Sequence, residues 1–206
     1  MTLCGCLGRN KVIRRKIVVL GDGACGKTSL LNVFTRGQFP QVYEPTIFEN
    51  YVYDMYLDDQ HIELLLWDTA GQEGFDRLRA LSYADTHVIL LCFSVDYRDS
   101  LENIENKWME EIIENCHGVK ICLVALKCDL RDDPRTIKNL QEAGQKPITY
   151  EEGLEVAKNI QAARYLECSA LLDRGVKEVF QHAAKVSLRT KAKGNSHPKR
   201  RACTIL

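Results

Sequence analysis

The sequence lacks the long apolar segments that membrane spans and secretion signals require. No apolar run approaches the roughly 18 residues of a transmembrane helix, and the N-terminus has no apolar core of about 7 to 15 residues. We therefore expect neither a spanning helix nor secretion. The nine cysteines include no C-x-x-C pair, and the five histidines form no ligand cluster with them. This pattern disfavours a structural zinc site and predicts reduced thiols in the cytosol.

Acidic side chains are missing from both ends of the chain. Residues 1–16 carry five basic and no acidic side chains, and residues 181–206 carry seven basic and none acidic. The segment between them holds 16 basic and 28 acidic side chains. This acidic body offers no basic groove with stacking aromatics, so we expect no nucleic-acid partner. An anionic membrane that receives both basic ends is the favoured interpretation, and solvated tails are the alternative.

Apolar runs alternate with helical patterns, which predicts an α/β fold. The apolar runs that indicate buried strands are 17–20, 62–67, 88–93, 121–126 and a short one at 165–166. The helical patterns are 101–112 after an Asp99/Glu102 box, 154–157 after a Thr149/Glu152 box, and 176–183 after Asp173. The alternation favours a mostly parallel sheet with helices on both faces. A further strand pattern, 49–57, turns back at Asp58-Asp59, so it is predicted to be antiparallel and at one edge.

A phosphate-binding pattern, G-x-x-x-x-G-K-S/T, lies between the first predicted strand and a helix-forming stretch. Its glycines let backbone N–H groups surround a β-phosphate, Lys27 brings a charge to the β and γ oxygens, and the Thr28 hydroxyl can bind Mg²⁺. A glycine-rich turn without chemistry is the alternative, which the strand and helix context makes weak. The predicted nucleotide-binding residues here are Gly21, Asp22, Gly23, Ala24, Cys25, Gly26, Lys27, Thr28 and Ser29.

Two more polar motifs follow predicted strands, at the sheet edge where α/β proteins bind ligands. In the first, Asp68 is placed to hold Mg²⁺ through water, Gly71 lets its N–H approach a γ-phosphate, and Gln72 can orient the attacking water. In the second, Asp129 can accept two hydrogen bonds from guanine, which adenine cannot offer. The Lys127 stem can cover the base.

Residues Cys168-Ser169-Ala170 follow the last predicted strand and could supply a backbone N–H to the guanine O6, which makes Ser169 and Ala170 candidate binding residues. Singly, each of these motifs could be an ordinary turn. In the order in which they stand, they resemble the small GTPases of the Ras superfamily over residues 15–190. The resemblance implies a P-loop NTPase fold, with a six-stranded, mostly parallel sheet and one antiparallel edge strand.

Three segments resemble the Rho family in particular: F-P-x-V-Y-x-P-T-x-F-E-N-Y at 39–51, D-R-L-R-x-L-S-Y at 76–83, and a polar insertion at 132–146, expected to be helical. The first of these implies that Phe39 stacks on the base and that Thr46 closes over Mg²⁺ and the γ-phosphate. The Thr46 carbonyl and Gln72 would then place the water. The candidate catalytic residues are Gln72, Thr46, Lys27 and Gly23, and the candidate effector region is Tyr43, Pro45, Thr46, Phe48, Glu49, Asn50 and Tyr51, with Tyr43 also near the nucleotide.

The amino-terminal extension and residues 124–129 are most similar to a fungal Rho branch that acts in polarised secretion and actin organisation. A monomeric GTPase switch with Mg²⁺ is implied, with an exchange factor, an activating protein, a dissociation inhibitor and effectors as partners. The first-switch stretch, residues 38–51, contains no arginine, so hydrolysis should be slow without an activating partner. A GTP-loaded membrane adaptor with negligible turnover and a P-loop kinase or ATPase are the alternatives.

The sequence departs from the family pattern at three places. Leu126 stands where the wider superfamily has Asn or Thr, so a bond between the base loop and the phosphate loop is expected to be lost. Leu171 replaces a common Lys. Gly74 and Ala80 are expected to loosen the second switch, where an acidic residue and Pro are usual.

Both ends carry candidate lipid anchors. Cys203 begins a C-a-a-X sequence that ends in Leu, which favours geranylgeranylation, and Cys4 and Cys6 are candidates for palmitoylation. We expect a basic extension at 1–14, a GTPase domain at 15–190 and a flexible polybasic tail at 191–206. The expected location is the cytoplasmic face of the plasma membrane or of secretory vesicles, with a cytosolic pool.

Overall fold

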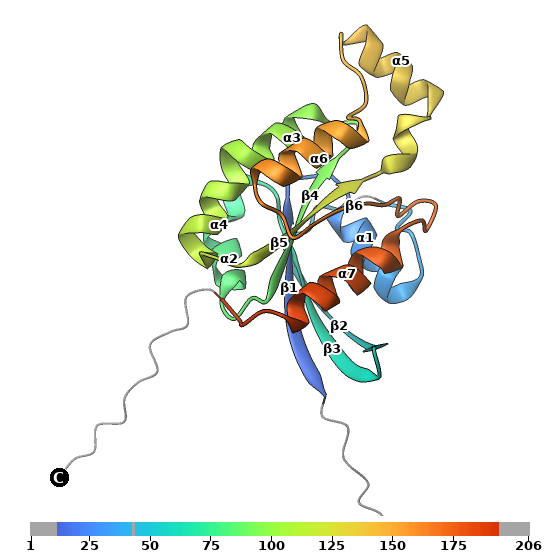
Figure 1. Ribbon diagram of the computed structural model, residues 1–206. Helices are drawn as coiled ribbons and strands as arrows, with labels where there is room; N and C mark the ends of the chain where they lie inside the picture. The colour runs from blue at the N-terminus through green and yellow to red at the C-terminus, as the bar shows by residue number, and fades with distance from the viewer. Residues whose placement is uncertain (1–11, 43, 194–206) are drawn as a thin grey trace, which may run out of the picture.

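The computed structural model describes residues 12–42 and 44–193, which form a six-stranded sheet between two layers of helices (Figure 1). The strand order is β2-β3-β1-β4-β5-β6, and every pairing is parallel except that of β2 with β3. The α/β prediction, including the antiparallel edge strand, is confirmed. The strands are β1 (Ile13–Gly21), β2 (Phe48–Leu57), β3 (Gln60–Thr69), β4 (Val88–Ser94), β5 (Lys120–Leu126) and β6 (Arg164–Glu167).

Alternate residues of the central strands fill two hydrophobic cores, one on each face of the sheet. Ile17 and Val19 of β1 belong to the core under α1 and α7, whereas Val18 and Leu20 belong to the core under α3, η3, α4 and α6. This alternation follows from the two-residue period of a strand.

The helices are α1 (Lys27–Arg36), η1 (Glu73–Phe75), α2 (Asp76–Ala80), η2 (Leu81–Tyr83), α3 (Arg98–Asn103), η3 (Ile104–Trp108), α4 (Met109–Cys116), η4 (Cys128–Arg131), α5 (Pro134–Glu142), α6 (Tyr150–Asn159) and α7 (Val176–Leu188).

Helix starts follow the sequence signals in one case and differ in two. Thr149 and Glu152 form the predicted capping box of α6. The helix predicted after an Asp99/Glu102 box instead has Tyr97 at its N-cap, and Asp99 lies in the first turn, where its charge favours the helix dipole. The helix predicted after Asp173 is α7, and its N-cap is Gly175 at φ 74°. Glycine is required there because a Cβ would lie 2.6 Å from the Glu167 carbonyl oxygen.

The predicted helix over 101–112 is continuous but contains a π-helical segment, η3, between α3 and α4. A π-helical turn widens the helix and re-aims the side chains that follow it. Asn103 directly precedes this segment and Trp108 is its last residue, and both donate hydrogen bonds to Asp22 in the phosphate loop.

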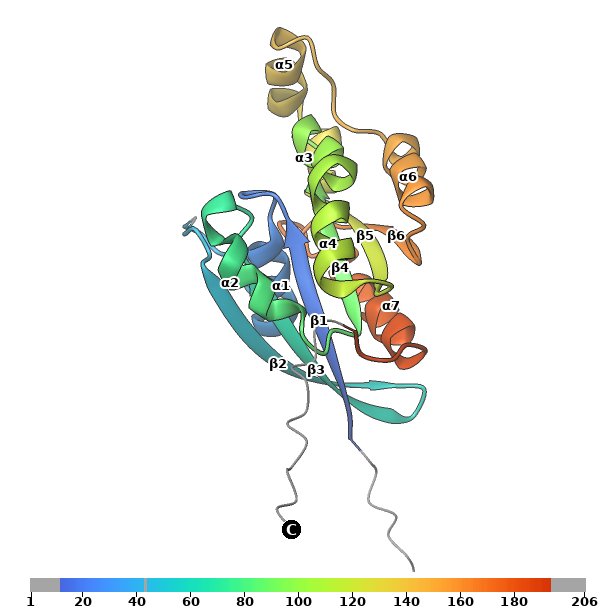
Figure 2. The same ribbon diagram turned by 90° about the vertical axis from the view of Figure 1, so that its left-hand side faces the viewer.

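The polar insertion forms α5, which buries none of its residues and stands apart from the body in Figure 2. Asp133 caps its N-terminus, so the predicted helical surface insertion is confirmed. The chain after α7 differs from a free tail in its first residues, because Lys193 and Thr86 exchange two backbone hydrogen bonds of 2.7 and 2.8 Å. Composition gave no sign of this pairing. Among the residues that the structure describes, no helix is both long and apolar enough to cross a membrane.

Candidate nucleotide site

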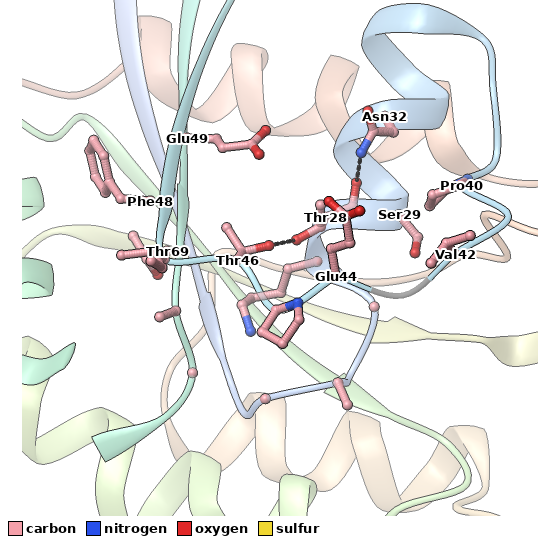
Figure 3. A pocket seen from close by; sticks show the side chains of 18 of the residues that line it. Thr28, Ser29, Asn32, Pro40, Val42, Glu44, Thr46, Phe48, Glu49 and Thr69 are labelled. Carbon is pink, nitrogen blue, oxygen red and sulfur yellow. Dashed lines mark hydrogen bonds between the residues drawn. The ribbon is translucent and has the colours of Figure 1, made fainter. Parts of the chain in front are cut away.

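The phosphate loop joins β1 to α1 and borders a cavity of about 830 Å³ that both switches also line (Figure 3). Gly21 has φ 136°, and a Cβ there would lie 2.1 Å from the Cys92 carbonyl oxygen. Gly26, at φ 109°, directly precedes the first residue of α1. The backbone therefore requires glycine at both positions. The N–H groups that begin α1 are thereby brought to the cavity, where they can bind an anion.

Lys27 is buried in the phosphate loop. Its Nζ atom donates hydrogen bonds of 2.7 Å to the carbonyl oxygens of Gly21 and Asp22. A buried ammonium group held on the wall of this cavity is suited to bind the oxygens of a polyphosphate. That Lys27 binds the β and γ oxygens stays a prediction.

Two hydroxyl groups and a carboxylate meet at the other side of the cavity. The Thr28 and Thr46 hydroxyl groups face each other (dashed line in Figure 3), and their oxygens are 2.5 Å apart. The Thr28 hydroxyl also donates to Asp68 Oδ2 at 2.7 Å. Asp68 is fully buried, and among the residues that the structure describes its Oδ1 atom has no hydrogen-bond partner. Burial is the main cause that raises the pKa of Asp68 to about 6. The Thr28 and Thr46 hydroxyls and the Asp68 carboxylate offer oxygen ligands alone, which are the ligands that Mg²⁺ prefers, and a buried carboxylate oxygen without a hydrogen bond fits a metal ion beside it.

The second switch, residues 71–83, begins in contact with the phosphate loop. A Cβ on Gly71 would lie 2.3 Å from the Asp22 carbonyl carbon and from the Gly23 nitrogen. A Cβ on Gly23 would in turn lie 3.5 Å from the Gln72 side chain. The structure therefore brings together Gly23, Gly71 and Gln72, and leaves Gln72 beside the loop predicted to hold the γ-phosphate.

The predicted base-binding residues surround a smaller pocket of about 130 Å³. Asp129 Oδ1 is buried there and has no hydrogen-bond partner within the described part of the chain, which fits a carboxylate that accepts hydrogen bonds from guanine N–H groups. Lys127 lies in the left-handed region at φ 55° and lines both pockets. The pocket residues are Gly26, Ser29, Phe39, Leu126, Lys127, Asp129, Leu130, Ala170 and Leu171.

Ser169 and Ala170 have different places in the base loop. Ser169 is buried, donates its N–H to the Arg174 carbonyl at 2.9 Å and accepts a hydrogen bond from the Leu172 N–H. It therefore shapes the loop, while Ala170 lines the pocket. The Leu126 side chain lies beside the phosphate loop, where its Cδ1 atom would be 3.7 Å from a Cβ on Gly26.

The effector region is only partly exposed. Pro45, Glu49 and Asn50 are exposed, and Phe48 packs edge-on against Trp67 with ring centroids 5.1 Å apart. Tyr51 corrects the prediction, because its side chain is buried in the core under α1 and α7. Strand alternation turns it inward, and its hydroxyl bonds to Glu49. The predictions for Tyr43, Cys4, Cys6 and Cys203 lie outside the described residues.

Sequence reasoning missed two buried polar contacts behind the site. The Asp22 carboxylate accepts hydrogen bonds from Trp108 Nε1 at 2.8 Å and Asn103 Nδ2 at 2.7 Å, so its side chain anchors the phosphate loop to the π-helical segment. Arg79 of the second switch is 1% exposed and pairs with Glu111 of α4. A Trp followed three residues later by Glu on an amphipathic helix was the available signal. The second switch is thus anchored at Arg79, where Gly74 and Ala80 had predicted a loose segment.

Comparison with known proteins agrees with this geometry. A sequence model of the Ras family matches residues 16–189. GTP-binding protein RHO3 of Eremothecium gossypii is 58% identical over the full length of both chains, and RHO3 of Saccharomyces cerevisiae is 55% identical over 99% of each. The rho3 protein of Schizosaccharomyces pombe is 61% identical over 93% of this chain and 92% of its own. One end of the sheet carries the phosphate loop, the contact of Thr28 with Thr46 and Asp68, and the pocket lined by Asp129. The chain belongs to the Ras family as a fungal Rho-type small GTPase, an enzyme that hydrolyses GTP.

Proposed function

We propose that this GTPase is a Mg²⁺-dependent switch at membranes whose GTP-bound form binds effectors of cell polarity, actin organisation and exocytosis. The resemblance of the amino-terminal extension and residues 124–129 to a fungal Rho branch of polarised growth supports the choice of pathway. The proposed partners are an exchange factor, an activating protein, a dissociation inhibitor and effectors.

The observation that carries the proposal is the contact of Thr46 with Thr28 beside Asp68. Thr46 belongs to the candidate effector region, whereas Thr28 and Asp68 belong to the phosphate and metal side of the cavity. Thr28, Thr46 and, through water, Asp68 would hold Mg²⁺, which when bound neutralises charge on the β- and γ-phosphates. Loss of the γ-phosphate would remove the interactions that hold Thr46 at this position, so hydrolysis would release residues 45–49.

Hydrolysis in this site depends on positioning and charge. Lys27 would neutralise phosphate oxygens, and Gln72 with the Thr46 carbonyl would orient the attacking water. Gly23 leaves open the space beside Gln72 that this water and a partner's arginine need. Because residues 38–51 contain no arginine, a partner that supplies one should raise the rate by roughly 10³ to 10⁵. The retained Gly23 and Gln72 argue against a GTP-loaded adaptor with negligible turnover.

A capture experiment from the native cell tests the switch. Full-length protein loaded with a non-hydrolysable GTP analogue should capture a set of proteins that the GDP form does not, and Thr46→Ala should lose that set. Capture of one and the same set by the GTP and GDP forms would contradict the switch and favour the adaptor.

For the membrane, we propose a geranylgeranyl group on Cys203, assisted by basic residues and by palmitoylation of Cys4 and Cys6. One lipid chain binds a membrane weakly, so a second signal is needed for stable residence. Cys203→Ser should move the protein to the cytosol, and a Cys4→Ser/Cys6→Ser double variant should show partial release. Unchanged membrane residence of the double variant, with no hydroxylamine-sensitive label on the unmutated protein, would leave the prenyl group and the basic tail as the anchors.

A further inference from the structure

Arg79 is the buried charged side chain of the second switch. It projects from α2 with 1% of its surface exposed, and its guanidinium is held by Glu111 through hydrogen bonds of 2.6 Å from Nε and 2.7 Å from Nη2. Nη2 also donates to Asp76 at 2.6 Å. Glu111 is itself fixed by the Tyr83 hydroxyl, which donates to Oε1 at 2.7 Å. A planar group with this many charge-assisted bonds has one orientation.

The free edge of the same guanidinium points to the start of the switch. Arg79 Nη1 donates to the Ala70 carbonyl at 2.8 Å and, more weakly, to the Gln72 carbonyl at 3.4 Å. The guanidinium also lies over the Trp108 ring, 4.8 Å from its centroid, and Trp108 donates to Asp22. The network therefore connects the phosphate loop to the backbone that carries Gln72.

Two other contacts in the described residues hold that backbone: Gly71 lies against the phosphate loop, and the Gln72 carbonyl accepts a hydrogen bond of 3.2 Å from the Phe75 N–H. The turn after Gln72 is a single short 3₁₀ segment, Glu73–Phe75, and a Cβ on Gly74 would have no neighbour within 4 Å among the described residues. Ala80, which follows Arg79, is exposed. Arg79 is therefore the buried side chain that ties α2 to the start of this switch.

We propose that Arg79 is a positioning residue for GTP hydrolysis, which acts by holding the Ala70 and Gln72 carbonyls and so the Gln72 side chain beside Gly23. The inference rests on the proposed role of Gln72 in orienting water. Arg79 itself touches neither nucleotide nor water. Misplacement of a catalytic group by about 1 Å costs on the order of 100-fold in rate, so its loss should be measurable even in a slow enzyme.

The experiment is single-turnover phosphate release from full-length protein preloaded with GTP. Arg79→Met, which keeps length and removes charge, should slow hydrolysis by roughly 10- to 100-fold, and Arg79→Lys should recover part of the loss. Dissociation of a fluorescent GTP analogue should change by less than about threefold, because the nucleotide contacts remain. Arg77→Met, on the exposed side of the same helix, is the matched control and should hydrolyse at the unmutated rate.

A double-mutant cycle separates positioning from a general structural role, since residues that act through one another are not additive. In a Gln72→Leu background, Arg79→Met should slow hydrolysis no further. An equal slowing in both backgrounds, or a normal rate for Arg79→Met alone, would overturn the inference. If Arg79→Met fails to fold, Glu111→Gln replaces it with the same expectations. A normal rate for Gln72→Leu would instead overturn the proposed role of Gln72, and this inference with it.

Discussion

Substitution of Gly71 by Ala should force the second switch away from the phosphate loop. The new Cβ would lie 2.3 Å from the Asp22 carbonyl carbon and the Gly23 nitrogen, and 2.5 Å from the Gly21 carbonyl oxygen. Carbon contacts are favourable at about 3.5 to 4.0 Å, so the two backbones must separate by roughly 1 Å. All three atoms belong to one tight loop, and no side-chain rotation can relieve the overlap.

The magnitude follows from that displacement. Overpacking of this kind lowers the free energy of unfolding by about 1 to 3 kcal/mol. A shift of about 1 Å at Gln72 costs on the order of 100-fold in hydrolysis rate. We therefore expect Gly71→Ala to remain folded, to bind GTP and to hydrolyse it roughly 100-fold more slowly in a single-turnover phosphate-release assay.

Gly74→Ala is the matched control in the same switch. Within the part of the chain that the structure describes, its Cβ would meet nothing within 4 Å, and the backbone there does not require a positive φ. It should hydrolyse GTP normally, and its free energy of unfolding should be unchanged or raised by about 0.4 to 1 kcal/mol, because Ala restricts the unfolded chain. If Gly71→Ala and Gly74→Ala gave the same rate and the same urea midpoint, the close approach of the switch to the loop would be refuted.

Four further predictions follow. Asp129→Asn should weaken GTP and favour xanthosine triphosphate in a competition assay, because an amide can donate to a carbonyl; unchanged base preference would contradict this. Leu126→Asn should slow nucleotide release by adding a polar bond to the loops, and stopped-flow release at the unmutated rate would rule that out. Glu111→Ala should lower the free energy of unfolding by about 3 kcal/mol in urea titrations, the low end for a broken buried pair, because the buried Arg79 charge loses Glu111 but keeps the exposed Asp76 as a partner. Burial raises the pKa of Asp68 from 3.8 to about 6, so between these pH values Asp68 is protonated in the folded state of the nucleotide- and metal-free protein and ionised in the unfolded state. The free energy of unfolding should therefore fall by roughly 3 kcal/mol as pH rises from about 4 to 6, and Asp68→Asn should flatten that dependence.

The sequence alone predicted the antiparallel strand at one edge of the sheet, and it placed the phosphate-binding and guanine motifs directly after buried strands. These predictions were possible because their signals are local. The apolar runs at 17–20 and 88–93 are short and alternate with helical patterns, which favours buried strands, and the Thr149/Glu152 box is complete within four residues. Motif order then placed Asp68 and Asp129 at the same end of the sheet, and each has a buried oxygen without a hydrogen-bond partner among the described residues.

The rest depends on contacts between distant residues. Asp22 meets Trp108 across 86 positions, and Arg79 meets Glu111 across 32. No periodicity or short motif encodes such pairs, and a charged side chain in a polar segment is by composition expected to face water. Tyr51 was assigned to the effector region for a related reason. A resemblance in sequence does not show which face of a strand a side chain occupies, and the Tyr51 side chain is buried.

The most direct test of the site is phosphate release from full-length protein loaded with γ-labelled GTP, measured with excess ATP and with or without Mg²⁺. We predict slow release that requires Mg²⁺, is unaffected by ATP, and falls by orders of magnitude in Gln72→Leu when an activating partner is present. Displacement of the GTP by ATP, or equal release from Gln72→Leu, would contradict the assignment of Asp129 and Gln72 on which the account depends.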